Sequence, residues 1–120
     1  MTYAEMKNLL QSVDDGVMRL EVLMDFGRQM APIPDDATCS EITGCASRVQ
    51  ICRHGNRFYG DADSAIVRGI VALIVAMVDN HSPKQIKNID ILGEIAGLNL
   101  GLGAGRMNGI NSMVRFLHNL

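Results

Sequence analysis

The sequence lacks any excess of positive charge. Its 120 residues carry a formal net charge of −2, and acidic and basic side chains are interspersed along the chain. A protein that binds a nucleic acid usually presents a row of lysines and arginines to the phosphates. We therefore do not expect a nucleic acid as a partner.

Long apolar runs are also missing. The most apolar stretch, residues 69–78, is much shorter than the roughly 20 residues that a membrane-spanning helix needs. The first residues, Met1–Glu5, show neither the basic start nor the short apolar run of a secretory signal. From these features we expect no association with a membrane and a cytoplasmic location.

Cysteine is scarce, with three residues at positions 39, 45 and 52 and no C-x-x-C pair of the kind that binds zinc. An odd number of cysteines in a reducing compartment does not predict a disulfide framework. Cys39 and Cys52 fall in expected strands, so we interpret both as packed side chains. Their spacing with Cys45 and His54 does not favour a metal site either.

Hydrophobic residues make up 48% of the chain, which is enough to form one compact core. We therefore expect a single domain over residues 1–120. Apolar residues at helical spacing predict helices over residues 3–13 and 17–27, the second of which must end before Pro32. A strongly apolar helix is predicted over 65–78, with Asp63 and Ser64 available to cap it. Short helices are expected after Ser82 and Asp90, and a last helix is expected after the glycine-rich segment 101–105.

Between these helices the period changes to that of strands. Val49 and Ile51 alternate with polar residues, and the turn-forming His54-Gly55-Asn56 precedes Arg57-Phe58-Tyr59. Residues 39–42 add a third expected strand. The sequence therefore predicts an α+β fold, with a small three-stranded antiparallel sheet packed against several helices.

Cys45 is the residue whose surroundings best suit reactive chemistry. It lies in the loop Thr43-Gly44-Cys45-Ala46-Ser47, where small neighbours leave room for another protein to approach. Arg48 or a more distant arginine would favour the thiolate. From local chemistry alone, a buried cysteine with a purely structural role fits equally well.

The segment Gly101–Gly105 resembles a phosphate-binding loop, because it precedes a helix. It lacks the strand that comes directly before such loops and the Lys-Ser/Thr that ends a P-loop. We interpret it as a tight turn that lets the last helix pack.

Three blocks of sequence together resemble the SufE family of sulfur-acceptor proteins, also called the Fe–S metabolism associated domain. They are Ile42-Thr43-Gly44-Cys45-Ala46-Ser47-Arg48-Val49, Asp61-Ala62-Asp63-Ser64-Ala65-Ile66-Val67-Arg68-Gly69 and Gly105-Arg106-Met107-Asn108-Gly109-Ile110. The first is similar to the family's Gly-Cys-x-Ser-x-Val signature, the second to its acidic helix start and the third to its Arg-x-x-Gly-Leu turn. The resemblance covers nearly the whole chain and implies the α+β fold that this family shares with IscU-type scaffolds.

The resemblance also implies a function. Cys45 would be the cysteine that carries a persulfide, and Gly44, Asp63, Arg68 and Arg106 would position its loop or dock the partner. The implied partners are a cysteine desulfurase of the SufS/CsdA type and a SufB-containing scaffold complex. No cofactor is expected on this chain, since pyridoxal phosphate belongs to the desulfurase. The protein would then be a sulfur-transfer module that stimulates the desulfurase rather than a stand-alone enzyme.

Two rival interpretations stay open at the level of sequence. One is an IscU-like scaffold that assembles an iron–sulfur cluster, although the cysteines here crowd into one short region. The other is an interaction domain in which Cys45 is merely packed. The sequence also leaves open whether the protein forms a homodimer.

Overall fold

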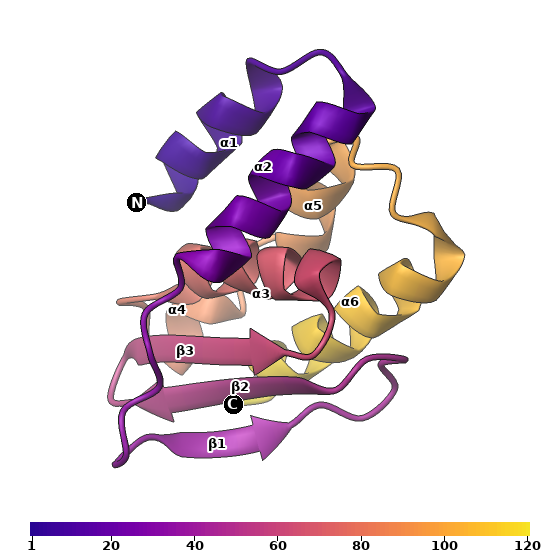
Figure 1. The fold of residues 1–120 in the computed structure, drawn as a ribbon. Helices are drawn as coiled ribbons and strands as arrows, with labels where there is room; N and C mark the ends of the chain where they lie inside the picture. Colours follow the sequence, from indigo (N-terminus) through magenta and orange to yellow (C-terminus); the bar gives the residue numbers. More distant parts are fainter.

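The computed structural model describes all residues from Met1 to Leu120 and shows the predicted α+β fold (Figure 1). In chain order the elements are α1 (Tyr3–Gln11), α2 (Gly16–Arg28), β1 (Thr38–Glu41), β2 (Val49–His54), β3 (Arg57–Ala62), α3 (Ala65–Val78), α4 (Pro83–Ile86), α5 (Ile91–Gly97) and α6 (Gly103–His118). None of these helices combines the length and the apolar character that a membrane span requires.

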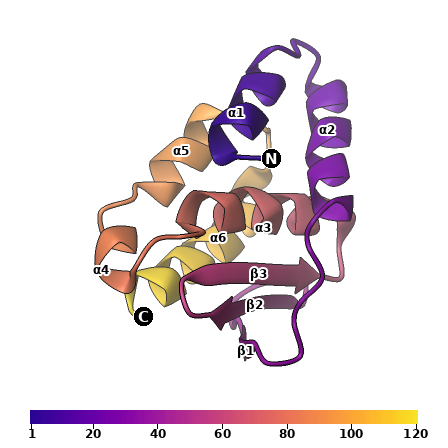
Figure 2. The same cartoon turned by 90° about the vertical axis from the view of Figure 1, so that its left-hand side faces the viewer.

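The three strands form one antiparallel sheet in the order β1-β2-β3. All of the helices lie on the same side of this sheet, with α3 directly against β3 (Figure 2). The face toward the helices carries the buried residues Val49, Ile51, Phe58 and Ala62. The opposite face is turned away from the helices. This arrangement confirms the predicted hairpin and its third strand.

Helix α3 is the centre of the core, as its apolar sequence predicted. Eight of its fourteen residues are buried. All of them but Gly69 belong to a cluster of apolar side chains contributed by every helix and by β2 and β3. Glycine allows the close packing around α3: a Cβ on Gly69 would lie 2.3 Å from the Leu23 carbonyl oxygen, and one on Gly60 would lie 2.5 Å from Val71. Helix α2 and strand β3 can therefore approach the core helix more closely than side chains would permit.

Side-chain caps begin most of the helices. Thr2 and Ser82 each form the predicted capping box, and Asp90 accepts a hydrogen bond from the Gly93 N–H. At the start of α3 the cap is Ser64 alone. Asp63, which we expected to share that role, bonds elsewhere, as described below.

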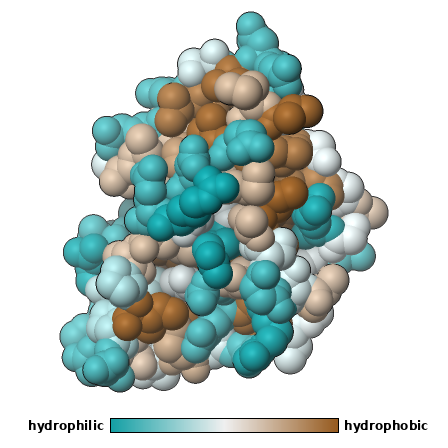
Figure 3. Space-filling model, viewed as in Figure 1, coloured by the Kyte–Doolittle hydropathy of each residue, from teal (hydrophilic) through white to brown (hydrophobic).

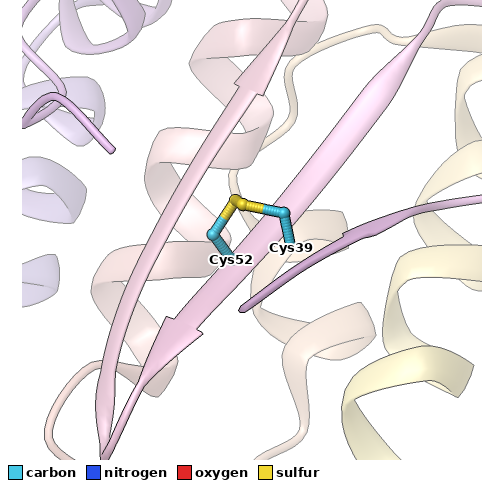
Figure 4. Close-up of a disulfide and its surroundings, with 2 residues drawn as sticks. All are labelled: Cys39 and Cys52. Carbon is cyan, nitrogen blue, oxygen red and sulfur yellow. A yellow bond between two sulfur atoms is a disulfide. The ribbon is translucent and has the colours of Figure 1, made fainter. Parts of the chain in front are cut away.

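The structure corrects the interpretation of two cysteines. Cys39 and Cys52, predicted to be unbonded packed side chains, are directly opposite each other on β1 and β2 and form a disulfide (Figure 4). The strand register brings them together, and composition and spacing did not reveal that register. Cys52 is buried but lies outside the main apolar cluster, on the face of the sheet away from the helices.

A few apolar side chains remain exposed on the N-terminal helices. Leu9 belongs to α1, while Val17 and Met18 lie in the first turn of α2. Figure 3 shows apolar surface over the part of the molecule that α1 and α2 form in Figure 1, among larger hydrophilic areas. Isolated exposed apolar side chains of this kind are common on folded proteins.

Candidate functional site

Cys45 lies in the loop between β1 and β2, as predicted. It is half-buried and is the free cysteine of the chain. Gly44 directly before it has a φ of +89°, which residues with a side chain rarely adopt. The loop therefore depends on glycine to turn the Cys45 side chain toward the helices.

The loop packs against the middle of α6. The Cys45 thiol donates a hydrogen bond to the Gly109 carbonyl, with 3.5 Å between sulfur and oxygen. A Cβ on Gly109 would lie 3.3 Å from the Cys45 Sγ, and a Cβ on Gly44 would lie 2.5 Å from the Ser112 Oγ. Two glycines, one on each side of the contact, thus allow the thiol to rest on the helix backbone.

Ser112 completes this contact surface and was not among the residues predicted from the sequence. It is the one buried polar residue of the chain; its hydroxyl donates to the Asn108 carbonyl and accepts from Arg115. The sequence did offer one signal for it: a serine between the apolar Ile110 and Met113, on the side of the helix that faces the core. We call Gly109 and Ser112 the α6 seat.

An apolar cavity of about 370 Å³ opens beside the thiol. Its walls come from the Cys45 loop, the start of α3 and α6 with the residues before it, and its apolar lining includes Val67, Ile70, Leu102, Ile110 and Met113. The space is large enough for an additional sulfur atom on Cys45. Its lining would keep such an atom largely away from water.

The electrostatics of the resting site favour the neutral thiol. Burial raises the pKa of the Cys45 thiol above its ordinary value, because a desolvated thiolate is disfavoured. The expectation that Arg48 would stabilise the thiolate is wrong for this conformation, since Arg48 forms an ion pair with Glu41 at 2.9 Å. Arg106 does line the cavity, where its guanidinium donates to the Leu102 carbonyl at 3.5 Å.

Asp63 holds the C-terminal end of the loop. Its carboxylate accepts a hydrogen bond from the Arg48 N–H at 3.0 Å, and its own N–H donates to the Arg48 carbonyl at 3.2 Å. Asp63 therefore joins the end of the Cys45 loop to the start of α3.

Arg68 lies apart from the thiol. Its guanidinium bonds to the Asp61 carboxylate at 2.9 Å and to the Ala62 carbonyl, and it does not line the cavity beside Cys45. Of the predicted site residues, the structure brings Gly44, Cys45 and Arg106 together. Asp63 lies at the base of the loop, and Arg68 faces a separate polar groove with Glu41 and Arg48.

The third block that suggested the family also differs from expectation. Arg106 to Gly109 was compared with a turn, whereas these residues lie within α6, which begins at Gly103. Within this helix, Gly109 is the residue that lies against Cys45. Gly101 and Gly103, with φ of +65° and +78°, make the predicted tight turn before the helix.

No group of three or more His, Cys, Asp and Glu side chains is placed to hold a metal ion. Two of the three cysteines are also bonded to each other. The side chains that an iron–sulfur scaffold would need are therefore not assembled in this conformation.

Comparison with known proteins agrees with the geometry. The chain is 32% identical to an uncharacterised SufE-like protein of Rhizobium meliloti (strain 1021), over 92% of this chain and 91% of that protein. Its fold is similar to the solution structure of a hypothetical protein from Thermus thermophilus, with a TM-score of 0.77 and 17% identity over 99% of this chain and 94% of the other. The family model for SufE, the Fe–S metabolism associated domain, matches residues 4–120, and the chain therefore belongs to the SufE family.

Proposed function

We propose that Cys45 accepts the outer sulfur of a persulfide formed on a cysteine desulfurase of the SufS/CsdA type, stimulates that enzyme, and passes the sulfur to a SufB-containing scaffold. Membership of the SufE family supports a sulfur-acceptor role in iron–sulfur metabolism and implies a cysteine desulfurase as partner in general. Pyridoxal phosphate, which forms the persulfide, belongs to the desulfurase. This chain supplies the accepting thiol.

The transfer is a thiol–disulfide type of exchange. The Cys45 thiolate attacks the outer sulfur of the desulfurase persulfide, a new S–S bond forms, and the bond between the two desulfurase sulfurs breaks. The desulfurase cysteine leaves as a thiolate. Cys45 then carries the outer sulfur with its proton, and no external oxidant or reductant is needed.

The observation that carries the proposal is the placement of one free thiol on a loop beside an apolar cavity. A thiol held against α6 in its neutral form is a poor nucleophile. It becomes reactive when the loop moves outward and water or a partner's charges reach the sulfur. The same cavity would shield the persulfide from thiols in solution once the loop returns.

Under this proposal, the positions of the remaining predicted residues support a role for each. Asp63 positions the loop through Arg48, and Gly44 allows its close approach to Ser112. Arg106 is exposed at the cavity, where its charge would stabilise the sulfur anion as the loop leaves. Arg68, paired with Asp61 on the surface, is a docking residue for the desulfurase.

The decisive experiment incubates the protein with a cysteine desulfurase and cysteine, and then locates the added sulfur by mass spectrometry of alkylated peptides. We expect a mass increase of one sulfur on the peptide that contains Cys45. Desulfurase turnover should rise when this protein is added, since the acceptor removes the persulfide that blocks the next cycle.

The Cys45→Ser variant and a Cys39→Ser/Cys52→Ser double variant serve as a matched pair. The first should neither take up sulfur nor stimulate turnover, whereas the second should still be loaded on Cys45. Sulfur found mainly on Cys39 or Cys52 in the wild-type protein, or full stimulation by Cys45→Ser, would overturn the assignment.

A further inference from the structure

The disulfide between Cys39 and Cys52 has no part in the proposed transfer, yet it lies in the two strands that bear the Cys45 loop. The strands place the two cysteines directly opposite each other, and both sulfurs lie on the face of the sheet away from the helices (Figure 4). Cys39 is exposed, whereas Cys52 is buried. Cys52 presents no surface to solution, so an attacking thiol must reach the pair through Cys39.

We infer that Cys39 and Cys52 form a redox-active site, which exchanges with a dithiol protein and whose state controls how readily the Cys45 loop leaves the α6 seat. Disulfides in reducing compartments, where the sequence led us to expect this protein, are usually transient or redox-sensing rather than structural. The second half of the inference rests on the proposed function, because it concerns the loop movement that presents Cys45.

The unequal exposure of the two cysteines sets the order of the exchange. A thiolate of the dithiol attacks the Cys39 sulfur, the Cys39–Cys52 bond breaks, and Cys52 leaves as a thiolate that takes up a proton. The second thiol of the reductant then attacks its own sulfur in the mixed disulfide and releases Cys39. Two electrons and two protons reach the protein, and the reductant leaves as a disulfide. A disulfide-bearing protein reverses the same steps.

Strand β1 transmits the redox state to the loop. It is a four-residue edge strand, and β2 is the one element with which it makes extensive contacts. The disulfide joins these two strands, so the covalent ring that it closes, with a sequence separation of 13, contains the whole Cys45 loop. Once the bond is reduced, β1 is held by its backbone hydrogen bonds to β2, by the Arg48–Glu41 ion pair and by the buried Ile42 that follows it.

The two ends of the loop differ in how they are fixed. Its C-terminal end is held by Asp63 and continues into the buried Val49. Its N-terminal end runs through the buried Ile42, whose N–H donates to the Val49 carbonyl at 2.9 Å, into the edge strand β1, which the disulfide ties to β2. Reduction therefore removes the covalent restraint on the β1 side of the loop and leaves Ile42 as its one buried anchor there, whereas the Asp63 contacts on the other side stay in place. The loop can then swing away from α6 without unfolding β2 or β3, which makes Cys45 more accessible in the reduced protein.

The test begins with the native protein purified without reductant and treated with a thioredoxin-type dithiol protein or with dithiothreitol. Alkylation followed by mass spectrometry should show two new modified thiols, on Cys39 and Cys52, with no denaturant present. Oxidised glutathione should restore the disulfide. A bond that breaks only after the protein is unfolded, or a pair that never forms the bond, would overturn the redox site.

The consequence for the loop is measured as the rate at which iodoacetamide modifies Cys45. We expect a several-fold faster rate in reduced wild-type protein and in the Cys39→Ser/Cys52→Ser variant than in the oxidised protein. The control is Asp90→Ala, which removes the cap of α5 and destabilises the fold away from β1; its Cys45 rate should match that of oxidised wild type. Equal rates in the oxidised and reduced proteins would overturn the coupling.

This assay uses no desulfurase, so its outcome is independent of the sulfur-loading experiment. If Cys45 takes up no sulfur but the rates differ, the proposed function fails and the redox-controlled loop stands. If Cys45 is loaded equally fast in both redox states and is alkylated equally fast, the proposed function stands and the redox control fails.

Discussion

At the scale of single residues, the site depends on what two positions lack. Gly44 and Gly109 have no side chains. The space that side chains would fill is therefore free, and the Cys45 sulfur lies 3.5 Å from the Gly109 carbonyl oxygen. The thiol is thereby partly desolvated and bonded as a donor, which only the protonated form can do. The resting conformation therefore favours the neutral thiol, and in the function that we propose its reactivity depends on leaving the seat.

Substitution of Gly109 by alanine should shift this balance toward the outward loop. The added methyl group would lie 3.3 Å from the Cys45 Sγ, closer than an ordinary van der Waals contact, so it crowds the seated loop. Overpacking of this kind costs about 1–3 kcal/mol, so the alkylation rate of Cys45 should rise on the order of tenfold. Gly97→Ala is the matched control, because that helical glycine has open space at its Cβ. An unchanged or slower rate in Gly109→Ala would show that the loop is not held by this contact.

The pH dependence of Cys45 alkylation follows from its burial. Burial raises the pKa of the thiol, so the thiolate in the folded protein forms at a higher pH than in a free cysteine. The midpoint of the rate against pH should therefore lie above roughly 8.5, the ordinary cysteine value. The same shift makes the stability of the fold depend on pH. The contribution of the buried thiol to the free energy of unfolding is fully present below the pKa that Cys45 has in the unfolded chain, and it is lost as the pH rises through the higher pKa of the folded protein. A midpoint at or below the ordinary value would contradict a desolvated resting thiol.

At the scale of elements, the sequence predicted the helices and strands well because their signals are local. Capping residues such as Thr2 and Ser82, and apolar residues at helical or alternating spacing, act over a few positions. The contacts that build the site are not local. Cys45 meets Gly109 across 64 positions, and the Cys39–Cys52 pairing depends on strand register, so neither could be derived from composition and spacing.

The link between the Cys45 loop and α3 is one such non-local contact, and Asp63 carries it. Asp63→Ala removes the acceptor for the Arg48 N–H, a bond to a charged group that contributes roughly 1.5–3 kcal/mol. We expect Cys45 to be alkylated several-fold faster in this variant while the circular dichroism of the helices is unchanged. Asp63→Asn keeps an oxygen acceptor at the same place and should retain most of the wild-type protection. Equal protection in the alanine variant would mean that the α6 contact alone holds the loop.

At the scale of the whole molecule, the N-terminal helix α1 is joined to α5, which lies far from it in the sequence. Lys7 forms an ion pair with Glu94 at 3.0 Å, and the Tyr3 hydroxyl donates to the same carboxylate. Burial, together with the charge and hydrogen bond of Glu94, raises the pKa of Tyr3 to about 12. Met6 and Leu10 of α1 belong to the same apolar cluster as α3 and α6. These contacts connect elements that are distant in sequence.

One shared core predicts one cooperative unfolding transition for residues 1–120. Far-UV circular dichroism reports the helices, while tyrosine fluorescence reports Tyr3 in α1 and Tyr59 in β3, and the chain has no tryptophan to obscure them. In urea the two signals should change together, with a slope of roughly 1–3 kcal/mol per molar denaturant. Reduction of the Cys39–Cys52 bond should lower the free energy of unfolding by about 3 kcal/mol, the usual effect of opening a ring of this length, and leave the transition single. Parts that share one core must lose their structure at the same denaturant concentration. Two separate transitions, or a tyrosine signal that changes before the helices unfold, would therefore show that α1 or the sheet forms an independent unit.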